Sequence, residues 1–292
     1  MEMNKISIMT MGMLKNAFSS YEKFHDVELF KEYYEEMLLA VSNAGYYGVD
    51  VTSHEVQIIG TEYIKDTLKR NRLFVSSYIY FDYFAKSDNE INKRIEEAKT
   101  AVDIAKELGT EIIMLVPVSH KGIEMDRPEA IRANLINHWT PIAEYAVQNG
   151  LHPVVEDTPD LRMCFCKAAE VKDVMDAVPG LELVYDSGNM ILDGEDPIEY
   201  AKEFIGRIGY VHLKDIKIMS DGSESRERMR DGRPTICVPT GMGIVDIKGV
   251  VGALLDMGYK GGMTVEYAKH SGKTYPDSLR KSREYVETYM RR

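Results

Sequence analysis

The sequence predicts an α/β protein folded as a (β/α)8 TIM barrel, and three observations support this prediction. Short runs rich in β-branched and aromatic residues alternate with longer segments whose apolar residues recur at spacings of three and four. One strand, one helix and a glycine-containing return recur every roughly 30 to 40 residues, which suits a barrel of this length. No linker rich in proline, glycine or serine divides the chain, so we expect a single domain over residues 1–292.

Eight short segments have the composition of buried strands. Most are rich in valine, isoleucine and tyrosine, and several end at a charged residue. In chain order the expected strands are 5–12, 47–52, 73–82, 111–118, 152–157, 181–186, 209–215 and 262–267. Eight parallel strands are the number that closes a TIM barrel.

Helix-like segments lie between and after these strands. The two clearest cover residues 27–45 and 90–109, and each ends at a glycine, a residue that commonly follows the last helical turn. Further helices are expected at about 126–149, 167–178, 196–205, 246–258 and 276–291.

Composition argues against nucleic acid and membranes as partners. The chain has 36 Lys and Arg against 47 Asp and Glu, a formal charge of −11, which opposes binding to phosphate backbones and anionic lipids. No stretch approaches the roughly 18 consecutive apolar residues of a membrane helix. The three cysteines are too few for a disulfide framework, and the N-terminus does not resemble a signal peptide. We therefore expect a cytoplasmic protein.

Four polar residues stand at the C-terminal ends of the last four predicted strands. They are Glu156, Asp186, His212 and Glu266. Active sites of TIM barrels form at this end of the strands. Side chains alternate between the two faces of a strand, and this parity permits all four to point into the barrel. Parity turns Asp157 away from the barrel axis, so we expect it to cap or support its neighbours.

Three carboxylates and one imidazole at one barrel mouth predict a divalent metal ion. Without a cation the carboxylates would repel one another, and oxygen ligands with one histidine suit Mn²⁺, with Mg²⁺, Co²⁺ and Zn²⁺ as alternatives. A cation there would stabilise an enediolate formed when a proton leaves the carbon beside a metal-bound carbonyl. Two carboxylates could remove and return that proton, which is epimerisation.

The same strand ends carry a family resemblance. The segments VVED, VYDSGNMILDGEDP, YVHLKD and PTGMGIVDIKGVVGALLDMGYKGGMTVEY resemble the xylose isomerase-like sugar (phosphate) isomerase/epimerase superfamily, and the likeness in pattern runs from about residue 5 to 290. The resemblance implies that Glu156, Asp186, His212 and Glu266 hold the metal. It also implies that Glu156 and Glu266 are the catalytic acid/base pair, acting on a ketose or ketose phosphate through a cis-enediolate.

Three positions depart from the ketose 3-epimerases of that superfamily. Those enzymes carry His, Glu and Arg where this chain has Asn189, Arg162 and Lys217. The segment HLKD is also similar to the corresponding strand end of inosose dehydratases. An isomerase or epimerase is therefore the first prediction, and a metal-dependent lyase, either an inosose-type dehydratase or a 3-keto-glycoside eliminase, is the alternative. A non-catalytic sugar-binding barrel is the second alternative.

Five residues are candidates for contacts with a substrate: Asn189, Lys214, Lys217, His54 and His120. Lys214 shares the face of His212 and could bind a substrate oxygen or pair with a nearby acid. The two histidines follow the second and fourth strands, at the end where substrates bind, although taken singly each is more typical of an ordinary polar loop residue. The expected partner is a small sugar or sugar phosphate, and the sequence leaves a homo-oligomer open.

The segment 217–243 is expected to be a long loop of mixed charge on the active-site face. It contains four arginines: Arg226, Arg228, Arg230 and Arg233. A phosphate-binding lid, a subunit contact and a solvated loop are all consistent with this composition.

Overall fold

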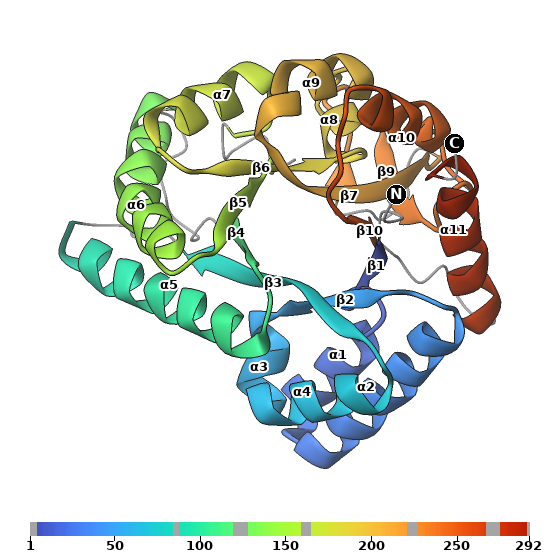
Figure 1. Ribbon diagram of the computed structural model, residues 1–292. Helices are drawn as coiled ribbons and strands as arrows, with labels where there is room; N and C mark the ends of the chain where they lie inside the picture. Colours follow the sequence, from blue (N-terminus) through green and yellow to red (C-terminus); the bar gives the residue numbers. More distant parts are fainter. Residues whose placement is uncertain are drawn as a thin grey trace.

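The centre of the protein is a closed barrel of parallel strands (Figure 1). The computed structural model describes residues 5–83, 88–118, 128–158, 165–220, 227–266 and 275–290. The barrel strands are β1 (Ile6–Met9), β2 (Gly48–Thr52), β3 (Phe74–Tyr83), β4 (Ile112–Val118), β5 (His152–Glu156), β6 (Glu182–Asp186), β7 (Ile208–Ile218) and β10 (Met263–Glu266). Because β10 pairs in parallel with both β1 and β7, the sheet closes on itself. The predicted (β/α)8 fold is confirmed.

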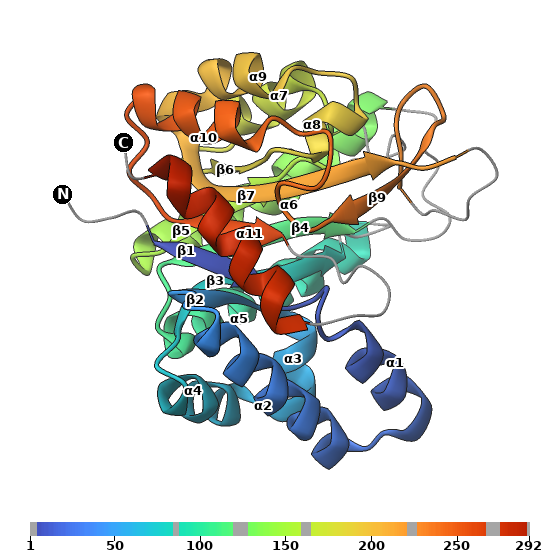
Figure 2. The same cartoon turned by 90° about the vertical axis from the view of Figure 1, so that its right-hand side faces the viewer.

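Helices surround the barrel on its outside (Figures 1 and 2). They are α1 (Lys15–Phe24), α2 (Val27–Asn43), α3 (Ser53–Ile59), α4 (Thr61–Arg70), α5 (Asp88–Leu108), α6 (Pro128–Gln148), α7 (Ala168–Ala177), α8 (Asn189–Leu192), α9 (Pro197–Phe204), α10 (Ile247–Asp256) and α11 (Tyr275–Met290), with a 3₁₀ turn at Ile205–Arg207. No helix in the described part of the chain is long and apolar enough to cross a bilayer.

Four helices, α1, α3, α4 and α8, were not expected from the sequence. The helices α3 and α4 are short and meet at Gly60, whose φ of 76° interrupts the helical period. Helix α3 begins with a capping box, in which Thr52 and Glu55 satisfy each other's backbone N–H groups. Gly60 divides this region into helices of seven and ten residues, so neither has a long apolar period that the sequence would reveal.

The core has two layers, one inside the barrel and one between the barrel and the helices. Inside the barrel lie Met9, Ile79, Met114, Val154, Val184 and Tyr210, which pack as one cluster. Val154, Val184 and Tyr210 each stand two residues before Glu156, Asp186 and His212. Because side chains alternate between the two faces of a strand, Glu156, Asp186 and His212 form the next interior layer toward the C-terminal end of the barrel.

The segment predicted as a loop at 217–243 contains a β-hairpin. Strand β7 continues past the barrel and pairs antiparallel with β9 (Pro234–Val238), which also pairs with β8 (Glu227–Arg228). Figure 2 shows β7 and β9 projecting together beyond the other strands. Asp215 holds the segment that follows β9. Its carboxylate accepts hydrogen bonds from the backbone N–H groups of Gly241, Gly243 and Val245.

The arginines of this segment have acidic or backbone partners. Arg230 Nε lies 3.0 Å from Asp193 Oδ1, and Arg233 pairs with Asp231. Arg228 donates to the carbonyl oxygen of Gly232. Arg226 lies outside the described residues. Arg228 and Arg233 therefore make contacts within the hairpin, and Arg230 connects the hairpin to Asp193, just after helix α8.

Candidate metal centre

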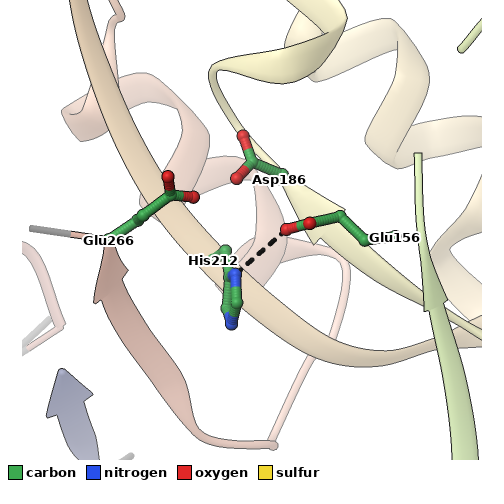
Figure 3. A group of neighbouring side chains, drawn as sticks. All are labelled: Glu156, Asp186, His212 and Glu266. Carbon is green, nitrogen blue, oxygen red and sulfur yellow. Dashed lines mark hydrogen bonds and ion pairs between the residues drawn. The ribbon is translucent and has the colours of Figure 1, made fainter. Parts of the chain in front are cut away.

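The structure brings Glu156, Asp186, His212 and Glu266 together inside the C-terminal end of the barrel. One potential ligand atom from each residue can be chosen so that all four atoms lie within 4.8 Å of one another. Figure 3 shows the three carboxylates grouped around a common space above the imidazole of His212. The residues come from β5, β6, β7 and β10, so four separate strands position one group.

Asp186 is held by the turn from β6 into α8. Its Oδ1 accepts hydrogen bonds from the backbone N–H groups of Gly188 and Asn189, at 2.7 and 2.8 Å. Its Oδ2 accepts no hydrogen bond within the described part of the chain although it is buried. Gly188 is required at this turn, because a Cβ there would lie 2.7 Å from Cγ of Lys214. The turn leaves one carboxylate oxygen of Asp186 available to a cation.

His212 is fully buried between two carboxylates. Its Nδ1 lies 3.1 Å from Glu156 Oε1, and its Nε2 lies 3.1 Å from Asp50 Oδ2. Burial alone would lower the pKa of His212, but its hydrogen bonds with Asp50 and Glu156 raise the pKa well above its usual value. Asp50 was not identified from the sequence, although a carboxylate in the middle of the buried strand β2 was a usable signal.

Lys214 places a buried ammonium beside the group. Its Nζ lies 3.4 Å from Glu266 Oε1 and 3.1 Å from both Asn189 Oδ1 and Glu227 Oε1. Burial would lower the pKa of Lys214, but Glu266 and Glu227 raise it well above its usual value. Burial would raise the pKa of Glu266, yet Lys214 and His212 together lower it. Lys214 therefore has two acidic partners, Glu266 and Glu227, beside the group.

The four residues fit a divalent cation. Bonds of about 2.0–2.4 Å to a central ion place two ligands at most about 4–4.8 Å apart, which matches the observed grouping. Burial and the nearby charge of Glu266 raise the pKa of Asp186 well above its usual value, and a cation beside Asp186 would oppose both effects. Oxygen ligands with one imidazole suit hard or borderline divalent ions.

The other residues singled out in the sequence have different positions. Asn189 joins the site, because its Nδ2 donates to the backbone oxygen of Asp157 and its Oδ1 accepts from Lys214. His54 is half-buried in the first turn of α3 and stacks on Phe81 with ring centroids 4.7 Å apart. Lys217 is exposed on the projecting part of β7.

Three further residues complete this comparison. His120 lies outside the described residues, as does Arg162. Asp157 is buried on the other side of β5 and is not one of the four, as its parity predicted. Burial and the charges of Asp186 and Glu156 raise the pKa of Asp157 well above its usual value.

Comparison with known proteins identifies the family. A family model described as xylose isomerase-like TIM barrel matches residues 38–289. The chain belongs to this family. The inosose dehydratase of Geobacillus thermodenitrificans (strain NG80-2) is 24% identical over 272 residues, which cover 87% of this chain and 88% of that relative.

Solved structures of other proteins share the fold. The D-allulose 3-epimerase of Methylomonas sp., in complex with D-allulose, superposes with a TM-score of 0.72 at 17% identity, covering 98% of this chain and 97% of the other. The IOLI protein, solved with a bound zinc atom, gives a TM-score of 0.70 at 16% identity and covers 98% of each chain. These names divide between a lyase and an epimerase, the two reaction classes that the sequence left open.

Proposed function

We propose that this family member is a divalent-metal-dependent lyase that eliminates water from a small ketone of the sugar or cyclitol class. This proposal reverses the order of the two classes expected from the sequence, in which an isomerase came first. The observation that carries it is the buried ammonium of Lys214, 3.4 Å from Glu266 and 3.1 Å from Asn189. The names of the full-length relatives, inosose dehydratases, support the same class.

An ammonium in this place suits elimination better than epimerisation. Epimerisation requires two groups that pass one proton between opposite faces of a carbon. Elimination requires a base for the carbon-bound proton and an acid for the departing hydroxyl. Lys214 is protonated at neutral pH, since Glu266 and Glu227 raise its pKa, and its contacts with Asn189 and Glu227 fix its position. Lys214 is therefore an ammonium in a fixed position, from which it can donate a hydrogen bond and then its proton to the departing hydroxyl.

Glu156 is the better placed base of the two glutamates. The Lys214 ammonium lowers the pKa of Glu266 despite the burial of that carboxyl, which makes Glu266 a weaker base. Glu156 keeps 15% of its side chain exposed and Glu266 keeps 20%, so a substrate can reach both, and the contact of Glu266 with Lys214 distinguishes them. Glu156 accepts the proton from the carbon beside the carbonyl, and the electron pair of that C–H bond forms a carbon–carbon double bond.

This double bond first joins that carbon to the carbonyl carbon, and the negative charge moves to the carbonyl oxygen. The double bond shifts toward the next carbon as the bond between the next carbon and its hydroxyl oxygen breaks. Lys214 gives its proton to that oxygen, so the products are water and an unsaturated ketone. Glu156 passes its proton to solvent and Lys214 regains one, which restores both groups. When bound by Glu156, Asp186, His212 and Glu266, a divalent cation supplies positive charge for the negative charge that develops on the carbonyl oxygen.

A ketose epimerase is the second candidate. It is favoured by the presence of two glutamates in one group, from strands β5 and β10 that are separated in the barrel by β6 and β7. In that reaction Glu156 and Glu266 would remove and return the proton on opposite faces of one carbon.

Incubation in D₂O with inososes and ketoses, in the presence of Mn²⁺, Mg²⁺, Co²⁺ or Zn²⁺, separates these reactions. We expect a product that has lost one water, detected by mass spectrometry. Lys214→Met should reduce its rate about 10²- to 10⁴-fold, the usual contribution of a positioned acid or base. Lys202→Met replaces an exposed lysine on α9, outside the group, and is the control that should keep the wild-type rate.

Other products would contradict the lyase. A deuterated sugar of unchanged composition would show the epimerase instead. No turnover of any ketone, together with no bound cation, would favour the sugar-binding barrel. A Lys214→Met variant with unchanged elimination would remove the observation on which the lyase rests.

A further inference from the structure

A buried carboxylate that is not one of the four grouped residues contacts His212, the histidine of that group. Asp50 lies on β2, and its Oδ2 is 3.1 Å from Nε2 of His212 on β7. Both side chains are completely buried. The two residues are 162 positions apart in the chain, and their strands are not neighbours in the barrel. The contact therefore crosses the interior of the barrel.

The two ring nitrogens of His212 face different surroundings. Figure 3 shows one nitrogen joined to Glu156 and the other pointing away from the group. A carboxylate only accepts hydrogen bonds, and a neutral imidazole has one N–H and one lone pair. Asp50 therefore requires the proton on Nε2. Without a cation Nδ1 also carries a proton, which it shares with Glu156. A cation on that side would take the place of this proton and bind the lone pair of Nδ1.

Asp50 is itself held in place by hydroxyl groups. Its Oδ1 accepts a hydrogen bond from the Tyr210 hydroxyl at 2.7 Å. The same hydroxyl lies 2.6 Å from Thr264 Oγ1, and because Tyr210 donates to Asp50, Thr264 donates to Tyr210. Tyr210 and Thr264 stand two residues before His212 and Glu266 on their strands, so this chain of hydrogen bonds forms the interior layer beneath the group.

Asp50 and Glu156 are not equivalent partners for the histidine. Asp50 is completely buried and fixed by a second hydrogen bond, whereas Glu156 is partly exposed and is one of the four grouped residues. A cation can replace the proton between Nδ1 and Glu156. A cation cannot replace the proton on Nε2 in the same way. Asp50 is held there through Tyr210 and Thr264, and it belongs to no second group of potential metal ligands among the described residues.

We propose that Asp50 is a positioning residue that fixes His212 with its proton on Nε2 and presents Nδ1 to a divalent cation. This inference rests on the proposed metal role of the four residues. A hydrogen bond from the second ring nitrogen to a carboxylate sets the tautomer and the ring orientation of a metal-binding histidine, and its loss usually costs 10- to 100-fold in metal affinity.

Three variants test the role of Asp50 with Zn²⁺ as the probe and without any substrate. Asp50→Leu keeps the approximate shape but accepts no hydrogen bond, and it should weaken Zn²⁺ binding about 10- to 100-fold in competition with a chromogenic chelator. Asp50→Asn should recover most of the affinity, because its amide oxygen still accepts the Nε2 proton. Tyr210→Phe removes only the hydroxyl that holds Asp50, so a smaller loss is expected.

A matched control comes from the register partner of Asp50 on the neighbouring strand. Ser77 pairs with Asp50, and its buried hydroxyl has no hydrogen-bond partner in the described residues. Ser77→Ala therefore removes an interior polar group without touching His212, and Zn²⁺ affinity should not change. Circular dichroism and thermal unfolding show whether each variant folds.

Nitrogen-15 NMR of the Zn²⁺-loaded wild-type protein tests the assignment even if Asp50→Leu fails to fold. We expect a proton on Nε2 of His212 and zinc on Nδ1. The reverse assignment, or equal Zn²⁺ affinity for wild type and a folded Asp50→Leu, would overturn this inference while leaving the lyase proposal intact. A wild-type protein that binds no divalent cation would overturn both.

Discussion

Replacement of Asp186 by asparagine should stabilise the metal-free protein and at the same time remove its response to a cation. The introduced amide would keep an oxygen for the backbone N–H groups of Gly188 and Asn189, so the turn into α8 is preserved. The variant would lose the negative charge that is buried within 4.8 Å of ligand atoms of Glu156 and Glu266.

The size of the effect follows from the spacing of these charges. Two like charges about 4.8 Å apart repel by about 3.5 kcal/mol at an effective dielectric constant near 20, and burial of an ion costs several kcal/mol more. Attraction between Asp186 and Lys214 offsets part of this cost. We expect the free energy of unfolding of the metal-free variant to exceed that of wild type by about 2 kcal/mol, which would raise its Tm by about 4–8 °C.

A cation should reverse the order of stability. At a concentration 100-fold above its Kd, a cation adds about 2.7 kcal/mol to the wild-type protein, whereas a variant that has lost a ligand gains little. Thermal unfolding with EDTA and with Mn²⁺ measures both differences. Asp196→Asn is the control, because Asp196 also accepts two backbone N–H bonds but is exposed and lies outside the group.

Two outcomes would refute this reasoning. One is a metal-free Asp186→Asn variant that unfolds at a lower temperature than wild type, which would mean that the carboxylates do not destabilise one another. The other is a Mn²⁺-induced rise in Tm as large in the variant as in wild type, which would place the cation elsewhere.

Two further predictions concern buried acids away from the four residues. Burial raises the pKa of Glu55 from 4.5 to about 7, so the folded state binds an extra proton between these pH values and wild-type stability should fall by about 3 kcal/mol as pH rises through them. Urea unfolding at pH 5 and pH 8 should show this loss in wild type but not in Glu55→Gln, and equal losses would contradict the assignment. Asp82→Ala should lower the free energy of unfolding by about 2–4 kcal/mol, because the buried ring nitrogens of His138 and Trp139 lose their shared acceptor. A loss below about 0.5 kcal/mol in the same urea experiment would show that this acceptor is not needed.

The strand ends were predictable because the evidence for them is local. An apolar run that stops at a polar residue defines a strand end, and parity says which side chains share a face. Glu156, Asp186 and His212 could therefore be assigned to one interior layer before any contact was known. Asp157 could be excluded from it for the same reason.

The hairpin after β7 and the short helices α3 and α4 were not predictable in this way. Strand β9 is held by pairing with the extension of β7 and by the contacts of Asp215, rather than by a hydrophobic period of its own. The mixed charge of the surrounding segment 217–243 therefore indicated a loop. Helix α3 depends on the cap formed by Thr52 and Glu55, a local feature that is easily overlooked in seven residues.

By itself the sequence determined the barrel, its strand ends and the four residues that face one another at its mouth. Tertiary structure alone decided that Asp50 reaches His212 and that Lys214 lies against Glu266 and Glu227. The direction of a side chain follows from the local alternation of a strand. The distance between side chains on different strands depends on the curvature and register of the closed barrel, which all eight strands set together.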